Sequence, residues 1–246
     1  MAEAKIIWVD ETESTNSALA YLARRGEATD GTVLAARAQS AGRGQRGNSW
    51  ESAPGMNLTC SILFAGRSFD VAQHFHVSEA VALAVAEIVD DELSGCKENV
   101  SVKWPNDIYV GDKKVCGILI ENVLTGRIIE RCIAGIGVNI NQEVFLSDAP
   151  NPVSLRQIDG KVRDVNAVLE RIANRVLENI ALGSAIHERY MERLWRKDGY
   201  HSYYDHLTGE RIEARITDVL PCGHLILALP SGEQREYAFK EVSALI

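Results

Sequence analysis

The chain has 246 residues, of which 46% are hydrophobic and 24% charged, so it is long enough to bury a sizeable core and too apolar to be disordered. Its net charge of -8, with lysines and arginines scattered along the chain, argues against a surface that coats nucleic acid. A few basic side chains in one pocket can still bind an anion. One or two domains are expected, and DNA is not an expected partner.

The cysteines are five in number and contain no close pair, so neither a disulfide framework nor a metal-ligating set is predicted. No apolar run reaches membrane-spanning length, and no apolar core follows a basic start at the N-terminus. These features predict a cytoplasmic protein with most of its thiols buried and without a membrane partner.

The first quarter of the chain reads as short strands with one helix. Strand-like alternation covers residues 6–9, and helical spacing begins at residue 18 after the polar stretch 10–16. Two further strands are predicted at residues 32–38 and 57–64. The glycine-rich segment at residues 42–50 should therefore be a loop between two strands.

In the middle of the chain, residues 77–93 are rich in Ala and Val, with acidic residues at helical intervals. This pattern predicts a long helix. Four apolar runs separated by glycine-containing turns follow it, at residues 100–104, 108–110, 115–122 and 128–140. Such closely spaced runs are typical of an antiparallel meander. The meander should form the centre of the main sheet.

Helical spacing returns over residues 165–195 and should cover one face of this sheet. After Lys197, tyrosines precede three short strands at residues 211–218, 225–229 and 235–239, which are separated by Pro-Cys-Gly and Pro-Ser-Gly turns. The predicted fold class is α+β, with a mixed, largely antiparallel sheet covered by helices. Two domains are predicted, residues 1–198 and a small β-barrel at residues 199–246.

The 42–50 loop is the first segment with chemical content. It reads Gly42-Arg43-Gly44-Gln45-Arg46-Gly47, followed by Asn48, Ser49 and Trp50. Its glycines let the backbone approach an anion, and its arginines can make bidentate contacts with phosphate or carboxylate oxygens. It is neither a dinucleotide fingerprint nor a P-loop, because no helix-forming sequence and no GKS or GKT ending follow. By itself it fits a flexible surface loop equally well.

The segment Lys103-Trp104-Pro105-Asn106-Asp107 places a lysine and an aspartate around a proline-constrained turn at the end of a strand. This rigidity suits a reacting centre, and an ordinary ion pair in a turn is the alternative. Lys114 follows the next turn. Strand alternation implies that only one of Lys113 and Lys114 faces inward.

Two further segments suit a small ligand. Ser14-Thr15-Asn16 offers two hydroxyls and an amide for a polar head group, and a helix N-cap is its alternative. Gly135-Ile136-Gly137 lets a ring lie flat on a strand, and a β-bulge is its alternative.

Taken together and in this order, these segments resemble the catalytic domain of biotin protein ligases, which adenylate biotin and then attach it to one lysine of a carrier protein. The resemblance covers nearly the whole chain. It implies the catalytic fold of biotin and lipoate ligases, similar to class II synthetases, with an SH3-like barrel at the C-terminus. It also implies ATP, biotin and Mg²⁺, with a biotin carboxyl carrier protein or domain as partner.

The resemblance further implies roles for individual residues. The biotin-binding set would be Ser14, Thr15, Asn16, Gln39, Arg43, Gly44, Gln45, Lys114, Gly117 and Gly135. The set that binds ATP or the adenylate would be Arg43, Arg46, Trp50, Lys103, Asn106 and Asn139. The catalytic set would be Lys103, Arg43 and Asp107. Asp107 would position a neighbouring group in preference to acting as a general base, and Gly137 would also give the ring room.

The 42–50 loop departs from the family at two positions. The family most often carries arginine where Gln45 stands and a basic residue where Asn48 stands. Because an uncharged amide holds a phosphate less firmly than a guanidinium, we expect the adenylate to leak from this protein.

Two alternatives to a ligase of biotin stay open. Some relatives begin with a helix-turn-helix domain, for which the residues before Ser14 leave no room, so repressor activity is not expected. A non-catalytic biotin sensor is the alternative among binding proteins. A lipoate protein ligase is the nearest enzymatic alternative, although such ligases generally lack the glycine-arginine loop.

Exposed sheet edges leave a homodimer open as a further partner arrangement.

Overall fold

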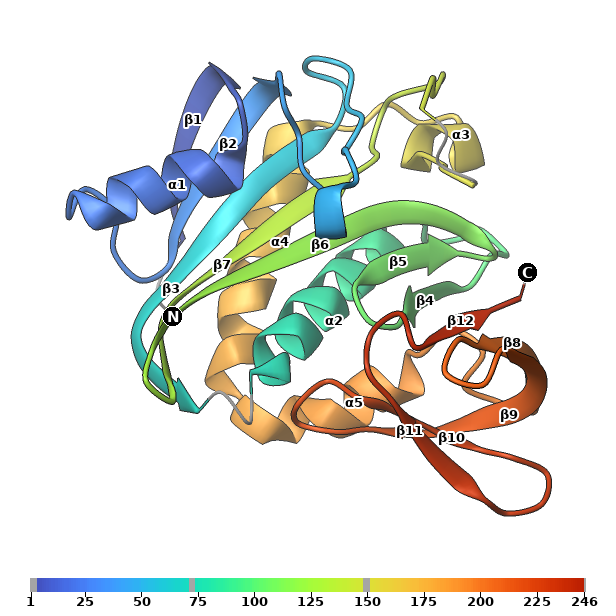
Figure 1. Cartoon of the computed structure of the whole chain (residues 1–246). Coiled ribbons are helices and arrows are strands. Elements are labelled where there is room, and N and C mark those ends of the chain that lie inside the picture. Colours follow the sequence, from blue (N-terminus) through green and yellow to red (C-terminus); the bar gives the residue numbers. More distant parts are fainter. Residues whose placement is uncertain (1–3, 71–73, 148–150, 246) are drawn as a thin grey trace.

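A seven-stranded sheet forms the centre of the computed structural model, which describes residues 4–70, 74–147 and 151–245 but not the side chains of residues 46 and 66–70. Figure 1 shows the strands in the order β1-β2-β3-β7-β6-β5-β4. Their bounds are β1 (Lys5–Thr12), β2 (Thr32–Gln39), β3 (Leu58–Asp70), β4 (Val100–Lys103), β5 (Asp107–Val110), β6 (Lys113–Thr125) and β7 (Ile128–Val138). Strands β1 and β2 are parallel and all other neighbours antiparallel, which confirms the predicted mixed sheet.

The meander predicted for residues 100–140 is present as β4, β5, β6 and β7, each paired with the next. Strand β3 then pairs with β7 over almost its full length. Strand β3 therefore joins the N-terminal strands β1 and β2 to the meander, and the loop between β2 and β3 leads into this central strand.

Helices lie on both faces of the sheet. On β3, Ile62 belongs to the large core with α2 (Phe75–Glu92) and α4 (Val165–Ala181), whereas the next residue, Leu63, packs with Leu19 of α1 (Thr15–Arg24). This alternation places α1 on the face opposite α2 and α4. The predicted coverage of one face thus describes α2 and α4, and α1 covers part of the other.

The helical stretch predicted for residues 165–195 is interrupted. Helix α4 ends at Ala181, and a short 3-10 helix η3 (Gly183–Ile186) leads into α5 (His187–Glu192). The break coincides with Gly183, whose φ of 61° is in the left-handed region. A short helix α3 (Leu155–Asp159), which begins with a Ser154–Gln157 capping box, was not predicted.

The C-terminal part of the chain forms a five-stranded sheet in the order β11-β10-β9-β8-β12. The bounds are β8 (His201–Asp205), β9 (Glu210–Val219), β10 (Leu225–Ala228), β11 (Gln234–Tyr237) and β12 (Val242–Ala244). The three predicted strands are β9, β10 and β11, and β8 and β12 are additional. Closure into a barrel and the boundary after residue 198 stay predictions.

His187 ties this C-terminal sheet to the helices. Its Nδ1 lies 2.7 Å from Glu79 Oε1 on α2, and its Nε2 lies 3.2 Å from Asp218 Oδ1 on β9. Burial alone would lower the pKa of His187, but its hydrogen bonds to the two carboxylates and their charges hold that pKa above 6.5. Within the described ranges, no helix is long and apolar enough to cross a membrane.

Candidate active site

A small pocket lies on the α1 face of the sheet, where β3, β7 and β6 run side by side. The strand register pairs Ser61 with Gly135, and two residues further on it pairs Thr59 with Gly137 and Gly137 with Gly117. Because alternate strand residues point to the same face, these positions form one surface. The glycines leave the middle of this floor without side chains.

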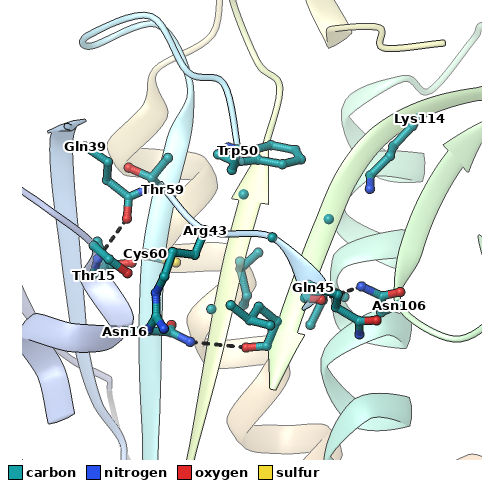
Figure 2. A pocket seen from close by; sticks show the side chains of 18 residues that line it. Thr15, Asn16, Gln39, Arg43, Gln45, Trp50, Thr59, Cys60, Asn106 and Lys114 are labelled. Atoms are coloured by element: carbon teal, nitrogen blue, oxygen red, sulfur yellow. Dashed lines mark hydrogen bonds between the residues drawn. The ribbon is translucent and has the colours of Figure 1, made fainter. Parts of the chain in front are cut away.

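The pocket has a volume of about 60 Å³ and is shown in Figure 2. All ten residues predicted to bind biotin line it, namely Ser14, Thr15, Asn16, Gln39, Arg43, Gly44, Gln45, Lys114, Gly117 and Gly135. They come from α1, β2, the 42–50 loop, β6 and β7. The fold therefore gathers segments that lie up to 121 residues apart in the sequence, from residue 14 to residue 135.

Buried and partly buried hydrogen bonds fix the polar groups where α1 begins. The hydroxyl of Ser61 lies 2.7 Å from Thr15 Oγ1 and 2.5 Å from Asn16 Oδ1. The Asn16 amide nitrogen donates to Glu121 Oε2 at 2.7 Å, and the Thr15 backbone N–H donates to Gln39 Oε1 at 2.8 Å. The Asn16 amide can thus adopt only one orientation. Ser14 is the N-cap residue of α1, as the alternative reading expected, but its side chain makes no capping hydrogen bond and lines the pocket.

The 42–50 loop folds over the pocket as a closed turn. The backbone N–H of Gly44 donates to the carbonyl of Asn48, and that of Trp50 donates to the carbonyl of Gly42. Arg43 Nη2 donates to Glu121 Oε2 at 2.8 Å and to Ser17 Oγ at 3.2 Å. Arg43 thus lies at the edge of the pocket, held by the same carboxylate that orients Asn16.

Arg46 was predicted to bind the adenylate, but its side chain lies outside the described residues. Its backbone belongs to a short 3-10 helix η1 (Gln45–Gly47) within the 42–50 loop. Gly47, the last residue of η1, has a φ of 88°, which favours glycine there.

Two glycines of the floor are required by close contacts above them. A Cβ on Gly137 would lie 2.4 Å from Cε2 of the Trp50 indole, and a Cβ on Gly135 would lie 2.4 Å from Asn16 Oδ1. The indole nitrogen of Trp50 is buried without a hydrogen-bond partner in the described part of the chain. In this structure the indole therefore fills the space above the floor that a flat ligand ring would need.

A larger cavity of about 930 Å³ adjoins the pocket and extends to the C-terminal sheet. Residues that line both cavities are Gly44, Gln45, Trp50, Asn106 and Lys114. Of the residues predicted to bind ATP or the adenylate, Trp50, Lys103, Asn106 and Asn139 line the larger cavity, whereas Arg43 lines only the pocket. Asp107 of the predicted catalytic set also lines the larger cavity.

Two lysines line the larger cavity, and one of them, Lys114, also lines the pocket. Lys114 Nζ lies 2.7 Å from Asp107 Oδ1, and both side chains are partly buried, whereas Lys113 is exposed. Lys103 Nζ donates to the hydroxyl of Tyr109 at 2.9 Å and lies 5.3 Å from the centre of the Trp195 ring. The carboxylate of the 103–107 segment thus pairs with Lys114, which leaves Lys103 held by aromatic groups.

Asn139 presents an unused acceptor beside the larger cavity. Its amide nitrogen donates to the carbonyl of Val153 at 3.2 Å, while its Oδ1 is buried and has no partner among the residues the structure describes. An unpaired buried oxygen costs free energy unless a ligand or water donates to it. Asn139 therefore offers a hydrogen-bond acceptor to a bound molecule.

Sequence reasoning missed Thr59, Cys60, Ser61 and Glu121 as neighbours of the site. Thr59 and Ser61 could have been found, because they alternate on one face of an otherwise apolar strand. Burial raises the pKa of the Cys60 thiol to about 12, which disfavours the nucleophilic thiolate form. Glu121 carries no local signal, because its role depends on contacts with residues more than 70 positions away.

The model of the Biotin/lipoate A/B protein ligase family matches residues 8–139. A relative from Paracoccus denitrificans named biotin--[acetyl-CoA-carboxylase] ligase is 32% identical over 168 residues, which cover 66% of this chain and 67% of that one. The Escherichia coli bifunctional ligase/repressor BirA is 39% identical over 129 residues, which cover 52% of this chain but 38% of that protein.

Among solved structures, the biotin protein ligase from Aquifex aeolicus in complex with biotin and ATP has a TM-score of 0.78 and 25% identity, and 97% of each chain is covered. The matched region spans less than two thirds of several curated relatives, including 38% of the Escherichia coli protein and 51% of a Bacillus subtilis one. The family match nevertheless covers more than half of the chain and includes the whole floor of the pocket. This chain is a member of the biotin/lipoate A/B protein ligase family.

Proposed function

We propose that the protein is an ATP-dependent biotin protein ligase. It would activate biotin as biotinyl-5'-AMP and transfer the biotinyl group to a lysine of a biotin carboxyl carrier protein or domain. The observation that carries this proposal is the junction of a glycine-floored, hydrogen-bonding pocket with a larger cavity that contains two lysines. The names of the Paracoccus relative and the Aquifex structure agree with it.

The small pocket suits the head group of biotin. A cyclic urea carries two N–H donors and one carbonyl acceptor but no charge, and the pocket offers neutral hydroxyl and amide groups in fixed orientations. The glycines at 117, 135 and 137 give a fused ring room against the strands. Because the Trp50 indole stands in this space now, binding would require the 42–50 loop to shift.

Adenylation needs positive charge at the junction of the two cavities. A carboxylate oxygen of biotin attacks the α-phosphorus of MgATP, the bond to the pyrophosphate oxygen breaks, and pyrophosphate leaves. Since two anions must meet, fixed cations lower the barrier. Lys114 lines both cavities and would hold the biotin carboxylate, while Lys103 would stabilise the α-phosphate. Arg43 would join them once it releases Glu121.

The adenine would lie in the larger cavity near the junction. Asn139 Oδ1 accepts no hydrogen bond from the described residues, and Trp50 and Asn106 line the same space. An acceptor of this kind suits an exocyclic amino group, and an indole suits the face of a purine. Displaced from the floor by biotin, Trp50 would then stack on the nucleotide and close the site to water.

Transfer of the biotinyl group is a second attack at the same place. The neutral amine of the carrier lysine attacks the acyl carbon, the acyl–phosphate bond breaks, AMP leaves, and the amine loses a proton. Asp107 is paired with Lys114 at 2.7 Å, which favours a positioning role over that of a free general base. The C-terminal sheet borders this cavity, so both parts of the proposed two-domain division, residues 1–198 and 199–246, would face the carrier.

Release of pyrophosphate distinguishes biotin from lipoate as substrate. The purified chain would be given MgATP and either acid, and pyrophosphate would be measured against time. We expect release with biotin alone, because the pocket matches a cyclic urea. Release with lipoate only would make the chain a lipoate ligase, and release with neither would remove the adenylation proposal.

A further inference from the structure

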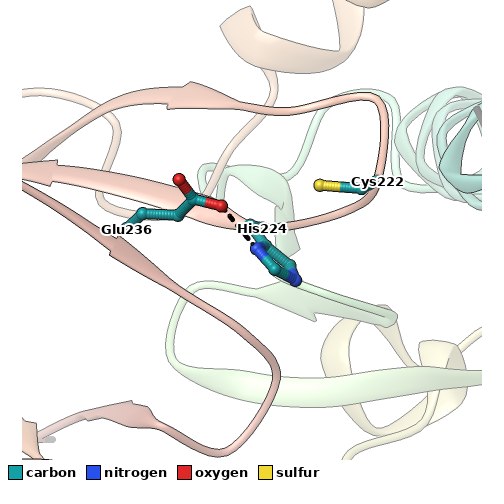
Figure 3. A group of neighbouring side chains, drawn as sticks. All are labelled: Cys222, His224 and Glu236. Carbon is teal, nitrogen blue, oxygen red and sulfur yellow. Dashed lines mark hydrogen bonds and ion pairs between the residues drawn. The ribbon is translucent and has the colours of Figure 1, made fainter. Parts of the chain in front are cut away.

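A second cluster of chemically reactive side chains lies in the C-terminal sheet, outside both cavities. It consists of Cys222, His224 and Glu236, whose ligand atoms all lie within 4.8 Å of one another. Figure 3 shows the sulfur and the carboxylate pointing toward one another with the His224 ring beside them. Cys222 and His224 are partly exposed and Glu236 is exposed, so an ion from solvent can reach all three.

The backbone holds these side chains close together. Cys222 and His224 flank Gly223 in the turn between β9 and β10, where the backbone N–H of Leu220 donates to the carbonyl of His224 at 2.8 Å. Gly223 has a φ of 87°, which a residue with a side chain rarely adopts. Glu236 lies on β11, directly across from Ile226 of β10. Little further ordering would be needed to bring the three groups onto one ion.

We propose that Cys222, His224 and Glu236 form a site for a divalent transition metal of the zinc type. A thiolate, an imidazole and a carboxylate are ligands that zinc accepts together, and three protein ligands leave a fourth position for water. His224 Nδ1 and Glu236 Oε1 are now 2.6 Å apart. Ligands on a tetrahedral zinc are about 3.4 Å apart, so the ion would replace the shared proton after a small opening of this pair.

This site was not predicted from the sequence. The five cysteines contain no close pair, whereas here the turn supplies a Cys-Gly-His sequence and the third ligand comes from β11. The alternative is a histidine–carboxylate hydrogen bond with a cysteine nearby. Because that alternative does not involve the sulfur, the role of Cys222 separates the two.

A bound ion would also brace the contact between the C-terminal sheet and the active site. The indole N–H of Trp104, in the 103–107 segment, donates to the carbonyl of Gly223 at 3.0 Å. The backbone N–H of Phe75, at the start of α2, donates to the carbonyl of Pro221 at 3.2 Å. The metal would therefore hold the turn that positions the neighbour of Lys103. An effect of the metal on activity would rest on the proposed function, whereas metal binding itself does not.

Binding of cobalt tests the site without ATP or biotin. The reduced, chelator-treated chain would be titrated with Co²⁺, whose thiolate complexes show a sulfur-to-metal charge-transfer band. We expect one ion per chain and a band that Cys222→Ser abolishes. Cys96→Ser is the matched control, since Cys96 is also partly exposed but lies elsewhere, and it should keep the band. Absence of the band, or its persistence in Cys222→Ser, would overturn the site.

Two further measurements cover the other ligands and the brace. His224→Ala and Glu236→Gln should each weaken Co²⁺ binding at least about tenfold, because each removes one of three ligands. Added Zn²⁺ should slow amide hydrogen exchange at the start of α2, where Phe75 bonds the turn, in the unmodified chain but not in Cys222→Ser. Unchanged affinity in both ligand variants would contradict the ligand set. Unchanged exchange would contradict the brace while leaving the proposed ligase activity untouched.

Discussion

The small pocket and the larger cavity are built in opposite ways. The pocket rests on the centre of one sheet, and the side chains of Thr15, Asn16 and Ser61 there are already hydrogen-bonded to one another. The larger cavity is bordered by loops and by a second sheet, and it contains a buried acceptor, Asn139 Oδ1, that has no partner in the part of the chain that the structure describes. Under the proposed function, the groups around Asn16 would meet the biotin head group with their orientations already fixed, whereas Asn139 Oδ1 would gain a partner only when the nucleotide binds.

Removing charge at the junction should have the largest effect. Lys103→Ala and Lys114→Ala should each lower the rate of biotin-dependent pyrophosphate release by about 10²–10³-fold, the usual loss when one charge-stabilising group is removed. Lys113→Ala is the matched control, because it removes an exposed lysine next to Lys114. Equal losses in Lys113→Ala would show that net charge, and not position, matters.

Filling the floor of the pocket should have the next largest effect. A Cβ at Gly137 overlaps the Trp50 indole at 2.4 Å, and overpacking of this kind costs about 1–3 kcal/mol. Gly137→Ala should therefore weaken biotin binding, measured by calorimetry, and lower stability. In a Trp50→Ala background, Gly137→Ala should no longer lower stability but should still weaken binding. If binding also recovers, Gly137 serves only to accommodate the indole.

Restoring the family's arginine should slow leakage of the intermediate. Gln45 lines both cavities, and its Oε1 is buried without a partner in the described residues. A charge-assisted hydrogen bond contributes about 1.5–3 kcal/mol, so Gln45→Arg should reduce the release of free biotinyl-adenylate about tenfold. Asn48→Arg adds the same charge at a more exposed position and should have a smaller effect. No free adenylate from the unmodified chain would contradict the expected leakage.

Removing the carboxylate that pairs with Arg43 should have the smallest effect on biotin binding. The Arg43–Glu121 pair is about 40–45% exposed, and pairs this exposed contribute about 0.2–1 kcal/mol. Glu121→Gln should therefore change the KM for biotin by about fivefold at most, with Glu130→Gln on the neighbouring strand as control. A loss comparable to that of Lys103→Ala would mean that Glu121 takes part in the reaction itself.

Much of the sheet could be predicted from the sequence, because its information is local. Each strand of the meander is an apolar run between glycine turns, and the 42–50 loop is bounded by two such runs. The break at Gly183 was missed because helical spacing continues across it. Strands β8 and β12 were missed because β12 has three residues and β8 mixes polar and aromatic ones.

The residues of the site could be predicted from the sequence, whereas several contacts between them could not. Its glycines, lysines and hydroxyls stand in recognisable segments, so their grouping could be inferred from a family resemblance. The pairing of Asp107 with Lys114 could not, because it depends on how β5 and β6 place two side chains. The position of the Trp50 indole over Gly137 also depends on the path of the folded loop. Contacts of this kind are set by tertiary structure and leave no periodic signal.

The most direct test of the ligase proposal is the mass of the acceptor. A biotin carboxyl carrier domain would be incubated with the chain, MgATP and biotin, and its mass measured before and after. The proposal predicts a gain of one biotinyl group on a single lysine, absent with Lys103→Ala and retained with Lys113→Ala. An unchanged mass with the unmodified chain, or a gain only when lipoate replaces biotin, would contradict it.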